Sequence, residues 1–494
     1  MTFTGLLIAL LSASASYYFF IALPPPASWG MAAAFGLLSC HALFVRPGKA
    51  KQKRRTVVKL KGLTWTREDF CRGWLITGDT GSGKTRSGIT PLLYQVFQNE
   101  PGWGGVCIDD KGVYWETLSE MAVHFNRQND LILLQVKPEG AGSEWKPPHS
   151  FNLTSDRSIP FSAYAKFVVD TASSLGQQGD KGFFKNQAQT HIAAALEMLY
   201  EIGADVTLEN VYHLLLDERD MEEALRDLTA AHPTERRRQL ADHFRNRFLS
   251  QPPEQIGGVK ETIANYLQYF LTPDIAQVFC PAENTFDFDE IDRGKIICIA
   301  MPQKFQAERR YVNTFLKMLF YTHVLRRFDK PKAERADANL LILWADEAQR
   351  FMTASEEGMS DYNAIDVIRE AHATVVAAAQ STTSFIPPLG REKARVLTLN
   401  LRNRMIFKAA DEDGAVESAD FLGKKKFIRR TWGFSHGKTT SNYSEQEEYK
   451  IKPYELRGLP KHTCIVAHCE HGFKRTVLPP LDPDGRVSVW FRNA

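Results

Sequence analysis

The sequence predicts an α/β fold, with a mainly parallel β-sheet flanked by helices, an inserted all-α domain and an N-terminal two-helix membrane anchor. Short apolar runs of strand type alternate with helical periods between Leu60 and Val136 and again after residue 285. Between residues 155 and 284 the apolar side chains instead recur with a period of 3.6, and Pro252-Pro253 and Gly257-Gly258 predict breaks between helices. Residues 1–45 contain no Asp, Glu, Lys or Arg.

Residues 78–85, GDTGSGKT, match the phosphate-binding pattern G-x-x-x-x-G-K-[S/T] at every defined position. The apolar run Trp74–Thr77 precedes them and a stretch that can form a helix, 86–98, follows, which is the order that the motif requires. Lys84 is expected to reach the β- and γ-phosphates, and Thr85 to offer its hydroxyl to Mg²⁺. We therefore expect a P-loop ATPase that binds ATP and Mg²⁺. The expected nucleotide-binding residues are Gly78, Asp79, Thr80, Gly81, Ser82, Gly83, Lys84 and Thr85.

A second apolar strand, 340–345, ends in Asp346 and Glu347. An acidic pair at the end of a strand downstream of a phosphate loop is the expected partner of Mg²⁺ and ATP. We expect Asp346 to orient the water ligands of Mg²⁺ and Glu347 to polarise the attacking water.

Two further polar residues lie near a third predicted strand, 374–379. Gln380 follows this strand, where it would sense the γ-phosphate or orient water, or else act as an ordinary polar cap. Arg369 precedes it and would either reach a neighbouring subunit's phosphates as an arginine finger or form a surface salt bridge.

The length of 494 residues favours several separately folding parts. The net charge of +3 excludes a polycation that coats nucleic acid, so any contact with a polyanion must be local. Seven scattered cysteines without a C-x-x-C pair are typical of free thiols in a reducing compartment. The expected division is a transmembrane hairpin (1–45), a first part of the nucleotide-binding domain (46–154), an all-α inserted domain (155–284) and a second part of the nucleotide-binding domain (285–494).

One cluster invites a metal-site interpretation. It comprises His462, Cys464, His468, Cys469 and His471. The spacing matches no familiar zinc pattern, and the alternation of the segment favours a β-strand from Thr463 to Cys469.

The charge-free N-terminus contains two apolar runs, 5–23 and 29–45, separated by three prolines. Each run is long enough to span a bilayer as a helix. A basic cluster follows, at Arg46, Lys49, Lys51, Lys53, Arg54 and Arg55. Under the positive-inside rule it places the ATPase domain in the cytoplasm, and we expect a multi-pass membrane protein in contact with lipid. The alternatives are a signal peptide cleaved near Ala13 or Ala15, and a DNA contact by the basic cluster.

Two other basic stretches stand out. The arginines between Arg236 and Arg247 form a basic helix, which is more typical of a solvated face than of a binding surface. Residues 424–450 are polar and basic, with Phe427, Trp432, Phe434 and Tyr443 among the charges, and are expected to form a projecting loop or hairpin. Such a composition suits stacking on single-stranded nucleic acid, and it also fits a plain loop.

Taken in order, the motifs resemble those of the type IV secretion coupling proteins, the TraG/TraD-like ATPases of conjugation within the RecA-like and FtsK/HerA-like group. The similarity covers nearly the whole chain. After the phosphate loop, the segments that carry it are ITPLL, IDDKGVYWE, FNL, FDFDEIDRGKIICIAMP, WADEAQRF, IREAHATVVAAAQS and YELRGLPKHTCIVA. Val113 departs from the pattern, because the family usually has Glu at this position of its Asp-x-Lys-Gly-Glu box.

The resemblance implies a RecA-like sheet, a homo-hexameric ring in the bacterial inner membrane, and hydrolysis of ATP between subunits. It implies single-stranded DNA, a relaxase–DNA complex or protein effectors as cargo, and type IV secretion channel proteins as partners. By position in the motifs, Lys84, Thr85, Asp346, Glu347 and Gln380 correspond to the family's nucleotide-site residues, and Arg369 to its suspected trans-acting arginine. Two other functions remain open: a DNA pump of the FtsK/HerA kind outside secretion, and a receptor or scaffold that binds ATP without hydrolysis.

Overall fold

The structure is a computed structural model and describes residues 17, 56–176, 182–230, 232, 234–355, 358–435 and 438–492. By its internal contacts the chain divides into residues 1–55 and 56–494, and the description below concerns the second unit. The apolar segments 5–23 and 29–45 lie outside the described residues, Tyr17 apart. The predicted boundaries near residues 154 and 284 remain predictions.

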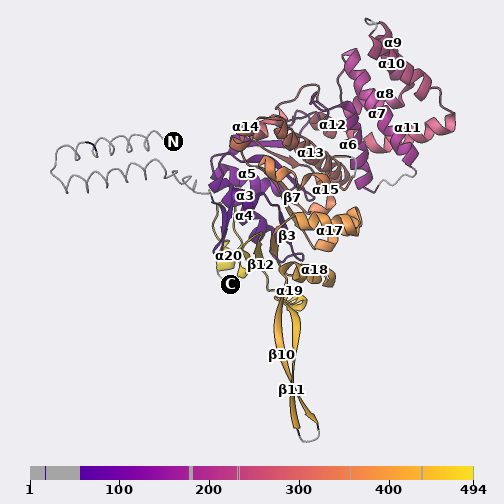
Figure 1. The fold of residues 1–494 in the computed structure, drawn as a ribbon. Coiled ribbons are helices and arrows are strands. Elements are labelled where there is room, and N and C mark those ends of the chain that lie inside the picture. Colours follow the sequence, from indigo (N-terminus) through magenta and orange to yellow (C-terminus); the bar gives the residue numbers. More distant parts are fainter. Residues whose placement is uncertain are drawn as a thin grey trace. The chain divides into compact units, whose positions relative to one another are not determined.

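A nine-stranded sheet forms the centre of this unit, in the order β13-β12-β9-β3-β8-β7-β4-β6-β5 (Figure 1). The strands from β9 to β5 run parallel, as predicted, whereas β12 is antiparallel to both β9 and β13. The bounds are β3 (Trp74–Thr77), β4 (Gly104–Asp109), β5 (Leu131–Gln135), β6 (Ile296–Ala300), β7 (Leu341–Asp346), β8 (Ala373–Ala379), β9 (Asn403–Ile406), β12 (Thr463–His468) and β13 (Gly472–Val477). The carboxyl ends of β3, β7 and β8 therefore lie at one edge of the sheet, where α/β sheets bind ligands.

Hydrophobic side chains cover both faces of the sheet, because the central strands alternate between two cores. In β7, Ile342 and Trp344 join one core and Leu341 and Leu343 the other. On the first side lie α3 (Arg67–Phe70), α4 (Thr90–Asn99), α5 (Tyr114–His124) and the hairpin of β1 (Thr56–Leu60) and β2 (Leu63–Thr66). The long helix α13 (Gln306–Arg326) covers the second side. This double covering explains why the strands read as continuous apolar runs.

The predicted helical region packs as a group of its own. It comprises α6 (Phe161–Ser174), α7 (Gly182–Ile202), α8 (Leu208–Leu216), α9 (Glu218–Ala230), α10 (Glu235–His243), α11 (Pro253–Leu267) and α12 (Pro273–Phe279). The group meets the sheet region through α6, whose Tyr164 ring stacks 6.4 Å from that of Phe315 in α13. In α10, Arg236 and Arg237 pair with Glu197 and Glu201 of α7, so these two arginines make contacts within the chain.

The break predicted at Gly257-Gly258 is wrong, because both glycines lie inside α11. A glycine weakens a helix by about 1 kcal/mol relative to alanine, and packing offsets this cost here. A Cβ atom at Gly258 would lie 2.7 Å from the ring of Phe184, so the glycine lets α11 and α7 approach closely.

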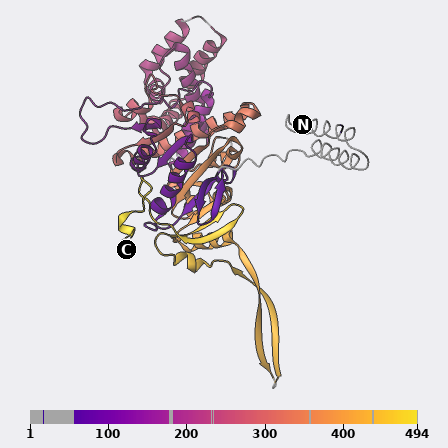
Figure 2. The same cartoon turned by 90° about the vertical axis from the view of Figure 1, so that its left-hand side faces the viewer.

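The predicted hairpin is present as a two-stranded ribbon of β10 (Lys424–Ser435) and β11 (Lys438–Tyr449). It leaves the body between α18 (Glu412–Leu422) and α19 (Pro453–Arg457). Two views at right angles show it extending away from the nine-stranded sheet (Figures 1 and 2). The remaining elements are the short helices α14 (Lys332–Asp337), α15 (Asp361–Ala364), α16 (Ile386–Leu389), α17 (Arg391–Asn400) and α20 (Val489–Arg492).

The prediction of a multi-pass inner-membrane protein is corrected by the structure. Among the residues that it describes, no helix combines the length and the apolar character needed to cross a bilayer. The long helices contain charged side chains: α13, for example, includes Arg309, Arg310 and Lys317.

Candidate nucleotide-binding site

The phosphate loop joins β3 to a helix, as the motif predicts, and backbone hydrogen bonds from three neighbouring segments hold it. Gly78 N–H donates to the carbonyl of Gln380 at 3.1 Å, and Asp79 N–H to that of Lys408 at 2.7 Å. On its other side, His462 N–H donates to the carbonyl of Ser82 at 3.0 Å. The loop is thus built against the carboxyl-terminal edge of the sheet.

The helix after the loop begins with a wide π-type turn, Lys84–Ile89, and continues as α4 from Thr90. Pro91 lies at the start of α4, where it has no N–H to donate to the preceding turn. A proline inside a helix favours a local bend, and here the wide turn Lys84–Ile89 directly precedes Pro91.

Lys84 is the central cation of the site and only 7% of its surface is exposed. Its Nζ donates to the carbonyl of Gly78 at 2.8 Å and lies 4.0 Å from Oε1 of Glu347. Burial lowers the pKa of Lys84, while the charges of Glu347 and Asp346 act in the opposite direction. The ammonium group therefore lies between the phosphate loop and the acidic pair.

Asp346 ends β7 in register with Asp109 of β4 and is 9% exposed. Thr85 Oγ1 donates to its Oδ2 at 3.3 Å, and Glu347 N–H donates to its Oδ1 at 3.0 Å. Burial and, next, the neighbouring Glu347 raise the pKa of Asp346 to about 6. A divalent cation would favour the charged form of such a carboxylate.

Glu347 adopts a left-handed backbone conformation with φ +53°, which is unusual for this residue type. Its Oε2 accepts a hydrogen bond from Nε2 of Gln349 at 2.7 Å, and its Oε1 is the atom nearest to Lys84. Residues held in such conformations cluster at functional sites. The sharp turn and the hydrogen bond together aim one carboxylate oxygen at Lys84.

Lys84, Thr85 and Glu347 line one cavity of about 350 Å³. Its lining residues are Asp79, Thr80, Gly81, Gly83, Lys84, Thr85, Arg86, Lys111, Glu347, Lys461, His462 and Trp490. The donors available to Mg²⁺ beside it are the Thr85 hydroxyl and the Asp346 carboxylate, the hard oxygen ligands that this ion prefers. The cavity has the polar loop and the cation that a triphosphate requires.

Gln380 and Arg369, the other two expected site residues, occupy opposite ends of β8. Gln380 follows the strand at the phosphate-loop edge, where its carbonyl bonds to Gly78, and its side chain is exposed. Arg369 precedes β8 at the amino-terminal end of this strand, away from the phosphate loop, and is also exposed. Within this chain, therefore, Arg369 does not join Lys84.

Residues that the motifs alone do not assign also line the cavity. Lys111 follows β4. Burial and the charge of Glu347 raise the pKa of Asp346, and the positive charge of Lys111 partly offsets this increase. Lys461 and His462 precede β12, and Trp490 lies in α20. The resemblance offered a signal for three of them, because Lys111 lies in the segment IDDKGVYWE and Lys461 and His462 lie in YELRGLPKHTCIVA. Trp490 lies in none of the quoted segments.

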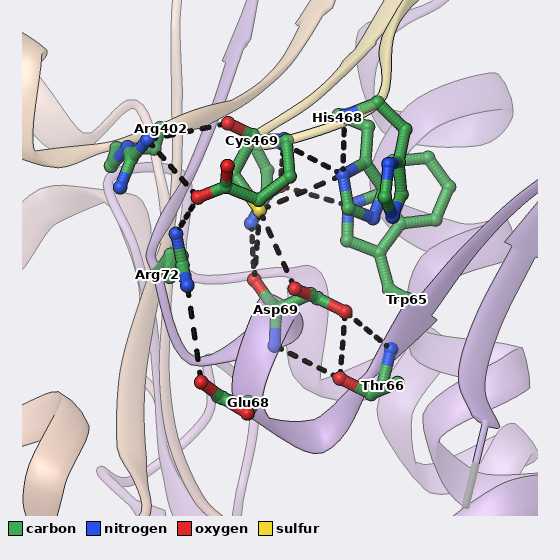
Figure 3. Close-up of polar contacts among 11 residues, drawn as sticks. Trp65, Thr66, Glu68, Asp69, Arg72, Arg402, His468 and Cys469 are labelled. Carbon is green, nitrogen blue, oxygen red and sulfur yellow. Dashed lines mark hydrogen bonds and ion pairs between the residues drawn. The ribbon is translucent and has the colours of Figure 1, made fainter. Parts of the chain in front are cut away.

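The five residues of the metal interpretation do not converge. His462 contacts the phosphate loop, and Cys464 is buried in β12, which is a strand as predicted. His468 and Cys469 instead meet Asp69 of α3, and the possible ligand atoms of these three lie within 4.8 Å of one another (Figure 3).

Hydrogen bonds account for the arrangement of that cluster. His468 Nε2 donates to the carbonyl of Thr64 at 3.1 Å, while its Nδ1 accepts the N–H groups of Glu470 and His471 at 3.0 and 3.2 Å. Burial raises the pKa of the Cys469 thiol to about 11. His468 thus ties the β12–β13 turn to β2, and Cys469 Sγ contacts Asp69 of α3 at 3.8 Å.

Comparisons with known proteins concern part of the sequence and most of the fold. Residues 360–474 match the family described as the type IV secretion-system coupling protein DNA-binding domain. No curated protein sequence is similar enough to this chain to match it.

Solved structures share the fold at low sequence identity. The bacterial conjugative coupling protein TrwBΔN70, in an unbound form, has a TM-score of 0.63 at 17% identity, with 88% of this chain and 91% of that chain covered. The structure of TrwB with ADP and Mg²⁺ has a TM-score of 0.59 at 15% identity, with 86% of this chain and 88% of that chain covered. The structure of TrwB with a non-hydrolysable ATP analogue has a TM-score of 0.58 at 16% identity, with 85% of this chain and 88% of that chain covered. The resemblance of this chain to the type IV secretion coupling proteins is thereby confirmed, in sequence over residues 360–474 and in fold over most of its length.

Proposed function

We propose that this protein is an ATPase that couples ATP hydrolysis to the recruitment and translocation of single-stranded DNA, or a nucleoprotein or protein substrate, into a type IV secretion channel. The observation that carries the proposal is the meeting of Lys84 and Thr85 with Asp346 and Glu347 around one cavity. A triphosphate with Mg²⁺ and an attacking water need these four groups together.

Each side chain has a distinct task in this proposal. Thr85 and Asp346 would hold Mg²⁺, which would supply positive charge against the triphosphate. Lys84 adds a second positive charge, and its burial strengthens the electrostatic attraction between this charge and the phosphates. Glu347 accepts a proton from the attacking water, and Gln380, at the same edge of the sheet, orients that water. The complex of TrwB with ADP and Mg²⁺, a protein of the same fold, supports the cofactor assignment.

DNA is the cargo that the chain supports best. The matched family, over residues 360–474, is described as a DNA-binding domain, and the match includes the β10–β11 ribbon. The part of the ribbon from residue 429 to 444 contains basic and aromatic residues but no Asp or Glu. Its Arg430 lies 3.9 Å from the ring centroid of Trp432 and 5.3 Å from that of Tyr443, and all three are exposed. Stacked aromatic and guanidinium groups suit single-stranded bases.

The position of Arg369 supports assembly into a ring, which we propose to be a homo-hexamer. Because Arg369 lies at the sheet edge away from its own phosphate loop, it can serve as an arginine finger only for a neighbouring copy. A relaxase–DNA complex and channel proteins are the partners that this function requires.

The experiment that tests the proposal compares the full chain with the Lys84→Ala variant. We expect the unaltered chain to bind and hydrolyse ATP, and the variant to lose binding. Equal turnover by the two would refute the site. Binding without turnover in the unaltered chain would favour the receptor or scaffold, and DNA-dependent turnover in cells that lack a relaxase and channel would favour a FtsK/HerA-like pump.

A further inference from the structure

The segment after β13 returns to the phosphate loop and is fixed there. Leu481 N–H donates to the carbonyl of Arg86 at 3.1 Å, and Asp482 forms an ion pair with the Arg86 guanidinium at 3.8 Å. Within the segment, Ser488 Oγ donates to Asp482 Oδ1 at 2.6 Å. These contacts place α20 beside the first helical turn after the loop.

A glycine turn anchors the same segment on α4. Gly485 has φ +78°, and a Cβ atom there would lie 2.3 Å from the ring of Tyr94. Only glycine allows both this backbone conformation and this close approach. The path to Trp490 is therefore defined at both Arg86 and Tyr94.

Trp490 lines the nucleotide cavity together with Lys461 and His462. His462 is buried, its N–H donates to the carbonyl of Ser82 in the phosphate loop, and its Nδ1 lies 2.8 Å from Oγ of Ser87 in the helical turn that follows. The Trp490 ring rests 5.3 Å from the His462 ring, with Lys461 Nζ 5.6 Å from its centroid. Trp490 remains 47% exposed, so the indole has a free surface next to the cavity.

We propose that Trp490 is the stacking surface for the nucleotide's base, supplied by the C-terminal segment. The inference rests on the proposed nucleotide binding. A phosphate loop recognises phosphates and leaves the base without a partner. A flat, half-exposed indole beside a cation offers the apolar face that a purine needs. Of the described residues that line the cavity, Trp490 and His462 are the aromatic ones, and His462 is already bound to Ser87.

Stacking does not read the hydrogen-bonding edge of a base. Loss of the Trp490 ring should therefore weaken the binding of ATP and of GTP to the same extent. The binding of a ligand that has phosphates and no base should stay unchanged. Inorganic tripolyphosphate is such a ligand.

The experiment measures dissociation constants of the full chain for Mg-ATP, Mg-GTP and Mg-tripolyphosphate by calorimetry. Trp490→Ala should raise the constant for both nucleotides about tenfold and leave that for tripolyphosphate unchanged, whereas Trp490→Phe should stay close to the unaltered protein. Tyr200→Ala, which removes a similarly exposed aromatic from α7, is the matched control and should change none of the three.

The outcomes separate this inference from the proposed function. Unchanged nucleotide affinity in Trp490→Ala, or an equal loss for all three ligands, would overturn the base platform. If the unaltered chain bound neither nucleotide nor tripolyphosphate, the nucleotide site itself would be refuted. Lys84→Ala provides the reference for that case, because it should weaken all three ligands.

Discussion

Lys84 and Glu347, far apart in the sequence, face each other with Nζ and Oε1 4.0 Å apart. One follows the strand that leads into the phosphate loop and the other follows β7, and the strand order brings both to one edge of the sheet. The proposed cation for the phosphates and the proposed base for the water thus line one cavity.

Glu347→Gln should separate ATP binding from hydrolysis. The amide keeps the shape and the hydrogen-bonding ability of the side chain, but it cannot accept the proton of the attacking water. We expect the turnover rate to fall by about two to four orders of magnitude, with ATP still retained in a filter-binding assay. Failure of this variant to retain ATP would contradict the role given to Glu347.

Arg369→Ala and Lys84→Ala should complement each other if Arg369 acts across a subunit interface. Each variant alone should hydrolyse ATP poorly, at a rate lowered by about 10³-fold or more for the arginine. Mixed assemblies contain some interfaces where an intact Lys84 meets an intact Arg369 from the neighbour. Mixing the proteins should therefore restore part of the activity, and no recovery at any mixing ratio would rule out the trans arrangement.

The β10–β11 ribbon should bind single-stranded DNA through its exposed aromatics. Joint replacement of Trp432 and Tyr443 by alanine should weaken binding of an oligothymidylate at fixed salt by at least about tenfold, because each stacked base contributes about 1–3 kcal/mol. Fluorescence anisotropy measures the change. Ile428→Ala, which removes an exposed aliphatic residue from the same strand, is the control. Equal affinity of the double variant and the control would exclude the ribbon as a DNA contact.

A buried cluster at α13 predicts how stability depends on pH. Burial alone would lower the pKa of His323, but its contacts with Asp289 at 3.0 Å and Asp292 at 3.2 Å raise it above its usual value. Burial would raise the pKa of Asp292, but His323 and Arg327 hold it well below its usual value.

The signs follow from these two shifts. A histidine whose pKa is raised by folding stabilises the folded state at pH values below the pKa of the unfolded histidine, and this stabilisation is lost as the pH rises through the pKa of the folded one. A carboxylate whose pKa is lowered by folding stabilises the folded state above about pH 4. His323→Asn should thus lower the free energy of unfolding by about 1–3 kcal/mol near pH 5.5, and by less near pH 8.5. Urea unfolding at both pH values measures this, and an equal loss at both would contradict the assignment.

The sequence allowed the central sheet to be predicted because its strands are buried on both faces and appear as apolar runs. Trp74–Thr77 and the acidic end of β7 were found where they were expected. The strand β13 escaped prediction, since its exposed Lys474 and Arg475 hide any apolar pattern. The break assigned to Gly257-Gly258 failed because local propensity carries no information about Phe184 across the helix interface.

The site was predictable where a motif fixes the spacing of its residues. Lys461 and His462 lie in the segment YELRGLPKHTCIVA, which assigned them no role at the site, and Trp490 lies in no motif. Tertiary packing of the last strand and helix brings these three residues to the cavity. Arg86 and Asp482, which hold that last segment in place, likewise meet through folding alone.

If nucleotide turnover is coupled to single-stranded DNA, the steady-state ATPase rate of the full chain, measured with and without a single-stranded oligonucleotide, tests it most directly. The rate should rise severalfold with DNA, and Lys84→Ala should abolish it. A measurable rate that is the same with and without DNA would contradict this coupling.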